Sequence, residues 1–120
     1  MFYNEFNDKV YKFEEDLNYL KRTGELDKTK DNMLNFANFF DQKVLVKSPD
    51  KSAGIEFKDE IVNKNPDASR YLDDYFLNSF SRFRDELHKE EPSTEKIIQE
   101  GMEILQRLRA FTKISSSSSY

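Results

Sequence analysis

Apolar side chains recur along residues 2–22 at steps of four and three, and this spacing constrains the fold more than any other feature of the sequence. On a helix, with 100° per residue, the repeating positions fall within an arc of about 80°. They are Phe6, Val10, Phe13, Leu17 and Leu20. The segment is therefore predicted to be a long amphipathic helix that buries one narrow face.

Three later segments repeat the pattern and supply the rest of the predicted core. A helix from about residue 27 to 47 carries the stripe Met33, Ala37, Phe40 and Val44. A helix over about residues 65–90 carries Leu72, Phe76, Phe80, Phe83 and Leu87. A helix beginning at residue 93 or 94 carries Ile97, Ile98, Met102, Ile104, Leu105, Leu108 and Phe111. These four main amphipathic helices predict an all-α fold, an antiparallel bundle.

Helix boundaries are marked by local signals. Gly24 lies just beyond Lys21 and Arg22, and basic residues in the last turn followed by a glycine are typical of a helix end. Asn65 and Pro66 resemble an N-cap and a first helical residue, so we expect the third long helix to begin there. Ser93 and Thr94 are both good caps for the last helix.

Residues 44–63 admit two interpretations. The short apolar runs at 44–46 and 55–57 can pair as a small β-hairpin. Alternatively the second helix ends near Lys47, because Pro49 prevents its continuation, and a short extra helix or a structured loop follows. We favour the second interpretation.

The chain has 120 residues, which fits one domain. It ends in five serines and a tyrosine, which offer no apolar surface to offset the entropy lost on ordering. We therefore expect a single helical domain over residues 1–114 and a flexible tail over residues 115–120.

The first and third predicted helices match each other when shifted by 70 positions. The match aligns Phe6, Val10, Phe13 and Leu17 with Phe76, Phe80, Phe83 and Leu87, and the acids Glu15 and Asp16 with Asp85 and Glu86. A duplicated helical hairpin explains this match, and so does chance between two heptad-patterned helices.

Composition excludes several classes of function. The sequence has no Cys and one His, so we expect no disulfide, no thiol nucleophile, no metal site and no cofactor. The net charge is −4 and no segment is strongly basic, which argues against a duplex-DNA or membrane-surface binder. No apolar run is long enough to span a bilayer, and the first residues do not resemble a signal peptide. We expect a cytoplasmic protein without catalytic activity.

His88 is the one residue suited to proton or phosphoryl chemistry near neutral pH. A lone histidine on a four-helix bundle raises the hypothesis of a phosphorelay module. The acids around it argue against that hypothesis, because they would repel an anion. Pro92 also argues against it, because it ends the helix within four residues. The simpler interpretation is a histidine that complements the helix dipole.

Gly101 falls on the apolar stripe of the last helix, where glycine costs about 1 kcal/mol relative to alanine. We expect this position to let a neighbouring helix approach closely, under a Phe ring.

A second stripe on the third helix consists of Tyr71, Tyr75 and Arg82. Tyrosine and arginine are enriched at binding hot spots, so we predict that this aromatic face binds a protein partner or a second copy of the chain. The protein would then be an adaptor, chaperone, inhibitor or small subunit of a larger assembly. The alternative is that the two tyrosines belong to the core.

A different function class rests on arginines and a lysine near helix ends. If they converge, Arg84, Arg107, Arg109 and Lys113, together with Arg82, would form a groove for RNA or single-stranded DNA. Ordinary complementation of a helix dipole explains the same residues.

Overall fold

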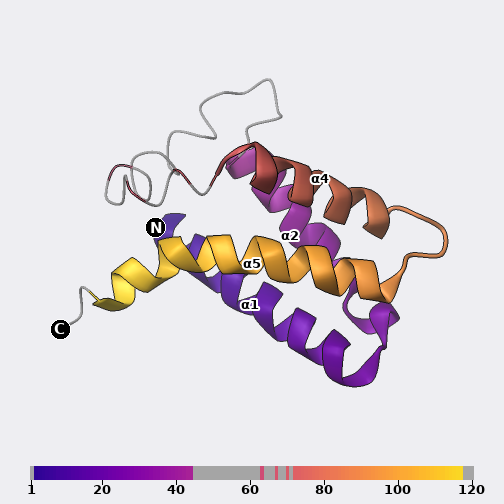
Figure 1. Cartoon of the computed structure of the whole chain (residues 1–120). Coiled ribbons are helices and arrows are strands. Elements are labelled where there is room, and N and C mark those ends of the chain that lie inside the picture. Colours follow the sequence, from indigo (N-terminus) through magenta and orange to yellow (C-terminus); the bar gives the residue numbers. More distant parts are fainter. Residues whose placement is uncertain (1, 45–62, 64–66, 68–69, 71, 118–120) are drawn as a thin grey trace.

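The computed structural model describes residues 2–44, 63, 67, 70 and 72–117 (Figure 1). Their secondary structure is helical, with no strand in these ranges, so the predicted all-α fold is confirmed. The helices are α1 (Phe2–Thr23), α2 (Lys30–Lys43), α4 (Asp74–Leu87) and α5 (Thr94–Ser117), and the 3-10 turn η1 (Leu26–Lys28) lies between α1 and α2. Among the described residues, none of these helices is both long and apolar enough to cross a bilayer.

The four helices form a closed ring of neighbours. The α1 helix packs against α2 and α5, and α4 packs against the same two helices. The chain reverses direction from each helix to the next in the order α1, α2, α4, α5, so the bundle is antiparallel as predicted (Figure 1).

The core consists of the predicted stripes together with Phe36 of α2. Every stripe residue of α1 is buried, and so are Phe76, Phe80, Phe83 and Leu87 of α4. Phenylalanine rings link the helices, since Phe13 stacks on Phe36 at 4.4 Å and meets Phe83 edge-on at 5.4 Å. Such ring pairs add about 0.5–1.5 kcal/mol each to the apolar burial. The stripes of α2 and α5 are buried apart from Val44, Ile98 and Met102, which are partly buried against this core.

Gly101 is buried where α5 crosses α1, which confirms the predicted close approach. A Cβ atom added there would lie 2.7 Å from Leu17 Cδ2 and 3.4 Å from Phe83 Cε1. The tightest neighbour is thus a leucine of α1, while the expected phenylalanine ring lies slightly farther away.

The boundary of α1 is as predicted, whereas the start of α4 is not. Gly24 has φ 71° and its N–H bonds to Leu20 O at 2.8 Å, which ends α1. The α4 helix begins at Asp74, about two turns after the predicted Asn65, because Asp73 is extended and its carboxylate accepts the N–H of Phe76. Leu72 consequently precedes the helix and is partly buried against the core.

The second helix is shorter than predicted at both ends. It begins at Lys30, after the η1 turn, and ends at Lys43, with Val44 as its C-cap. Residues 45–62, where the β-hairpin and the short extra helix were the alternatives, lie outside the described residues. The α5 helix extends to Ser117, three residues into the predicted tail, and residues 118–120 lie outside the description.

Candidate functional site

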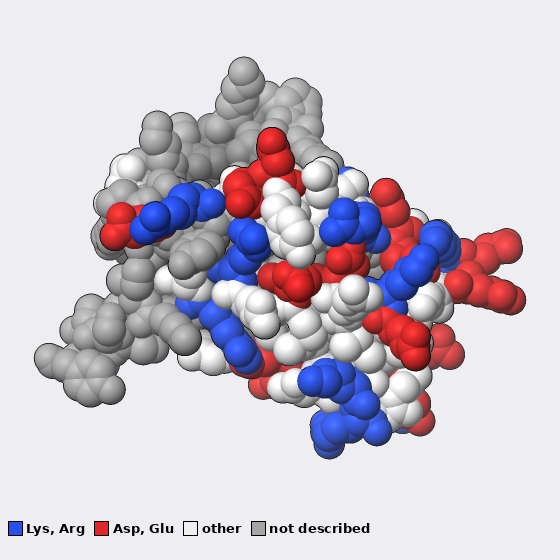
Figure 2. Space-filling view, viewed as in Figure 1, with Lys and Arg blue, Asp and Glu red and all other residues white. Residues whose placement is uncertain are grey.

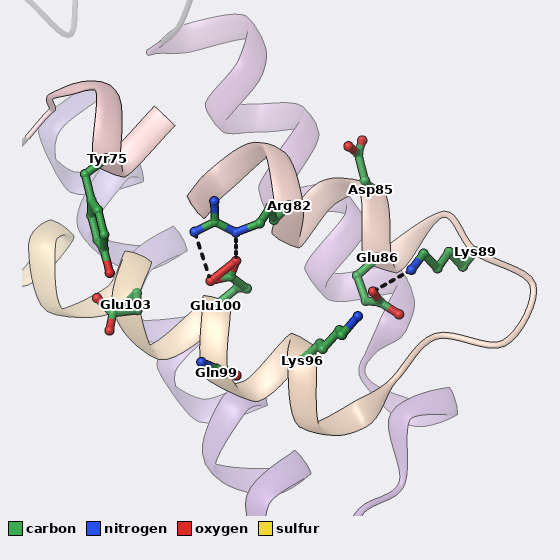
Figure 3. A pocket seen from close by; sticks show the side chains of 9 residues that line it. All are labelled: Tyr75, Arg82, Asp85, Glu86, Lys89, Lys96, Gln99, Glu100 and Glu103. Carbon is green, nitrogen blue, oxygen red and sulfur yellow. Dashed lines mark hydrogen bonds and ion pairs between the residues drawn. The ribbon is translucent and has the colours of Figure 1, made fainter. Parts of the chain in front are cut away.

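A polar groove of about 620 Å³ runs along the surface between α4 and α5 (Figure 3). Three basic and four acidic side chains line it together with one tyrosine and one glutamine: Arg82, Lys89, Lys96, Asp85, Glu86, Glu100, Glu103, Tyr75 and Gln99. Two of the predicted partner-binding residues, Tyr75 and Arg82, therefore share one surface feature. The third, Tyr71, lies outside the described residues.

Arg82 crosses the middle of this groove from α4 to α5. Its guanidinium donates to both carboxylate oxygens of Glu100, at 3.4 Å for the Nη2–Oε1 contact, and to Ser79 Oγ at 3.2 Å. The hydrogen bond to Glu100 raises the pKa of Arg82. These hydrogen bonds fix the side chain in place. It is 56% exposed, so it is still accessible.

Tyr75 closes one end of the groove and is 49% exposed. The guanidinium carbon of Arg107 lies 4.7 Å from the centre of its ring, a cation–π contact from α5. Arg107 also donates to Asp73 Oδ1 at 3.1 Å, and that oxygen accepts the N–H of Phe76. The backbone N–H of Phe76, and then Arg107, lower the pKa of Asp73. The tyrosine ring is thus held by an arginine that is itself anchored at the helix N-terminus.

Glu86 stands at the opposite end of the groove and is almost completely buried. Its Oε2 accepts the backbone N–H of Ser93 at 2.7 Å, and its Oε1 accepts from Lys89 Nζ at 3.0 Å. These bonds, the one from Ser93 first, lower the pKa of Glu86. The side chain therefore ties the end of α4 to the start of α5, and this role is structural.

The predicted nucleic-acid residues are dispersed over the bundle. Arg84 pairs with Asp41 of α2 at 2.9 Å, Arg107 with Asp73, and Arg109 with Glu14 of α1. Each arginine thus joins an acid of a different element, and the side chain of Lys113 lies outside the described part. On the face formed by α4 and α5, basic and acidic residues are interspersed (Figure 2).

Sequence reasoning missed the acids that hold these arginines, Glu14, Asp41, Asp73 and Glu100. Each ion pair joins residues of two elements, and no local spacing reveals a contact between distant segments. The N-cap preference of aspartate was the one available signal, and it identifies Asp73.

His88 is exposed and forms the C-cap of α4, which agrees with the simpler interpretation of its position. Its backbone N–H bonds to Arg84 O at 3.3 Å and Asp85 O at 3.2 Å. Within the described residues, no group of three or more His, Asp or Glu side chains is arranged to hold a metal ion.

A second groove, of about 590 Å³, lies between α1 and the start of α2. Its most buried acid is Asp16, 5% exposed, whose Oδ1 lies 3.7 Å from Lys12 Nζ. Burial raises the pKa of Asp16, against the opposing effects of Lys12 and of a hydrogen bond with Asn32. This acid and Glu86 therefore deviate from their usual pKa in opposite directions.

Comparison with models of protein families, with curated proteins and with solved structures finds no significant match.

Proposed function

We propose that this chain is a non-catalytic protein-interaction module of the cytoplasm, which binds a partner through the groove between α4 and α5. The observation that carries the proposal is that the side chain of Tyr75 is both exposed and held in place. Its ring is half exposed, yet Arg107 holds it in place and Asp73 holds Arg107. An aromatic side chain that is ordered before binding loses less conformational entropy when a partner covers it.

Arg82 supports the same proposal. It lies in the groove with Tyr75, and its bonds to Glu100 and Ser79 fix its orientation. Tyrosine and arginine carry much of the binding energy in protein interfaces when they lie at the centre of the contact. Both acidic and basic side chains line the groove. We therefore expect the partner to be a helix or loop that covers Tyr75 and whose own polar groups contact the charged side chains around it.

The test is affinity capture from cell extract with the tagged full-length chain and three variants. Tyr75→Ala and Arg82→Ala alter the groove, whereas Tyr11→Ala removes a 58%-exposed tyrosine from α1 and serves as the matched control. We expect wild type and Tyr11→Ala to retain a protein that both groove variants lose, with unchanged circular dichroism. Identical capture by all four proteins would contradict the proposal, and so would unfolding of Tyr75→Ala, which would place the tyrosine in the core.

Light scattering on the same proteins tests whether the partner is a second copy of the chain. In that case the mass of Tyr75→Ala is half that of wild type and Tyr11→Ala. Nucleic acid retained equally by wild type and Tyr75→Ala, and released as salt rises, would instead favour a nucleic-acid function.

A further inference from the structure

The bundle consists of two hairpins with equivalent core positions, α1–α2 and α4–α5. Positions 70 apart align the buried faces of α1 and α4, as the sequence predicts. Positions 64 apart align the second helices, and the aligned pairs are Thr29 with Ser93, Met33 with Ile97, Ala37 with Gly101, Phe40 with Ile104 and Val44 with Leu108. The caps, the large core residues and the small residue thus recur in the same order.

Packing between the hairpins follows the same equivalence. The α1 helix contacts α5, and its counterpart α4 contacts α2, which is the counterpart of α5. The order of the four helices around the bundle is therefore the one that a two-fold relation between the hairpins would produce. An apolar interface of this kind does not by itself distinguish one hairpin from the other, because both present the same class of side chain.

Among the described residues, two ion pairs cross between the hairpins and break this equivalence. Arg84 of α4 bonds to Asp41 of α2 at 2.9 Å, and both side chains are largely buried. Arg109 of α5 bonds to Glu14 of α1. Glu14 and Arg84 occupy equivalent positions, and Arg109 lies one helical turn beyond the counterpart of Asp41. The pairs thus have opposite polarity, at equivalent positions on α1 and α4 and one helical turn apart on α2 and α5.

We infer that these two reversed ion pairs select the hairpin partner, so that α1–α2 pairs only with an α4–α5 hairpin, of its own chain or of a second copy. If two α4–α5 hairpins paired with each other, Arg84 of each hairpin would occupy the position of Glu14 and face Arg109 of the other hairpin. If α1–α2 paired with its own kind, Glu14 would approach Asp41. Like charges in a partly buried interface penalise both arrangements.

The inference predicts that exchanging the two equivalent residues reverses the preference. The variant Glu14→Arg with Arg84→Glu has the same composition as wild type. Within one chain the new glutamate at position 84 faces Asp41, and the new arginine at position 14 faces Arg109. If two chains pair α1–α2 with α1–α2 and α4–α5 with α4–α5, the new arginine at position 14 approaches Asp41. The new glutamate at position 84 then faces Arg109, so both contacts are attractive. We expect the full-length variant to keep its helicity and to show twice the wild-type mass by light scattering.

Two controls separate partner selection from simple loss of stability. Adding Asp41→Arg and Arg109→Glu to the exchanged variant inverts both pairs completely and should restore the wild-type mass. Inverting an exposed pair within one hairpin, by Glu25→Lys with Lys28→Glu, should leave the mass unchanged.

A milder variant covers the case in which the exchanged chain unfolds. Arg84→Glu introduces one repulsion within the chain and one attraction between α4–α5 hairpins, so its dimer fraction should rise with protein concentration. The inference is wrong if the exchanged variant folds with the wild-type mass. It is equally wrong if that variant unfolds while Arg84→Glu keeps the wild-type mass at every concentration.

Discussion

Replacing Gly101 by alanine places a methyl group where α5 touches α1. In an exposed helix the change stabilises by about 1 kcal/mol, because glycine is the poorer helix former. Here the new Cβ would lie 2.7 Å from Leu17 Cδ2 and 3.1 Å from Leu17 Cδ1, closer than packed carbon atoms approach. Leu17 is fully buried and has little room to turn away. Overpacking of a tight core costs about 1–3 kcal/mol, so we expect a net loss of about 1 kcal/mol.

A double-mutant cycle isolates this contact. Leu17→Ala alone should cost about 2–5 kcal/mol, since it removes a large buried side chain. In that background the methyl group of Gly101→Ala no longer clashes with Leu17 and keeps an ordinary contact with Phe83 Cε1 at 3.4 Å. The second substitution should then stabilise by about 1 kcal/mol. The sign of the Gly101→Ala effect therefore changes between the two backgrounds.

Urea unfolding followed by circular dichroism measures all four free energies of unfolding. The coupling between the two positions should be about 2 kcal/mol, within the range seen for residues in direct contact. If Gly101→Ala changes the stability by the same amount in both backgrounds, the glycine does not serve the approach of Leu17 and the reasoning fails. Gly101→Leu should prevent folding outright, and unchanged thermal stability of that variant would lead to the same rejection.

Three acids yield further predictions; those for Asp16 and Glu86 are checked by urea unfolding between pH 3 and pH 7, and that for Asp73 by NMR relaxation. Burial raises the folded-state pKa of Asp16, so the stability it contributes is complete below its unfolded pKa and is lost as pH rises through the folded value. Asp16→Asn should be more stable than wild type at pH 7 and lose this advantage in acid; lower stability at pH 7 would contradict the burial argument. Hydrogen bonds lower the pKa of Glu86, so its contribution is present above the unfolded pKa and is lost as pH falls through the folded value. Glu86→Gln should be less stable at pH 7, with a deficit that shrinks in acid; a constant deficit would show that charge is irrelevant. Asp73→Asn keeps a good N-cap and weakens the bond to Arg107, so Tyr75 should become more mobile by NMR relaxation while stability changes little; an unchanged ring would show that Arg107 needs no anchor.

The sequence predicts the core of this bundle well because burial follows helical periodicity. Phe6, Leu17 and Phe80 each lie on a stripe that spacing alone identifies, and each is fully or almost fully buried. Gly101 could be identified for the same reason, because its position on a stripe is a property of its own helix. What lies opposite it, Leu17, depends on the crossing of two helices and has no local signature.

The start of α4 shows a different limit, the competition between two plausible caps. Asn65 with Pro66 is the stronger local signal, yet the helix begins after Asp73. Asp73 satisfies the N–H of Phe76 and also holds Arg107, which belongs to α5. The second interaction joins residues 34 positions apart, so only the folded chain reveals it.

Asp16 and Glu86 show how equivalent residues acquire different chemistry. They align along the chain, both are acidic and both are almost completely buried. Glu86 belongs to a hairpin whose second helix begins shortly after it, and Ser93 offers it a backbone N–H at 2.7 Å. Asp16 lies about two turns before the end of α1, and its charged neighbour is Lys12, whose Nζ lies 3.7 Å from Asp16 Oδ1. Because a backbone N–H stabilises the carboxylate of Glu86 while burial dominates at Asp16, the two pKa values shift in opposite directions. The pKa of each carboxyl group therefore depends on how far its helix continues beyond it. It does not follow from the charge pattern that the two hairpins share.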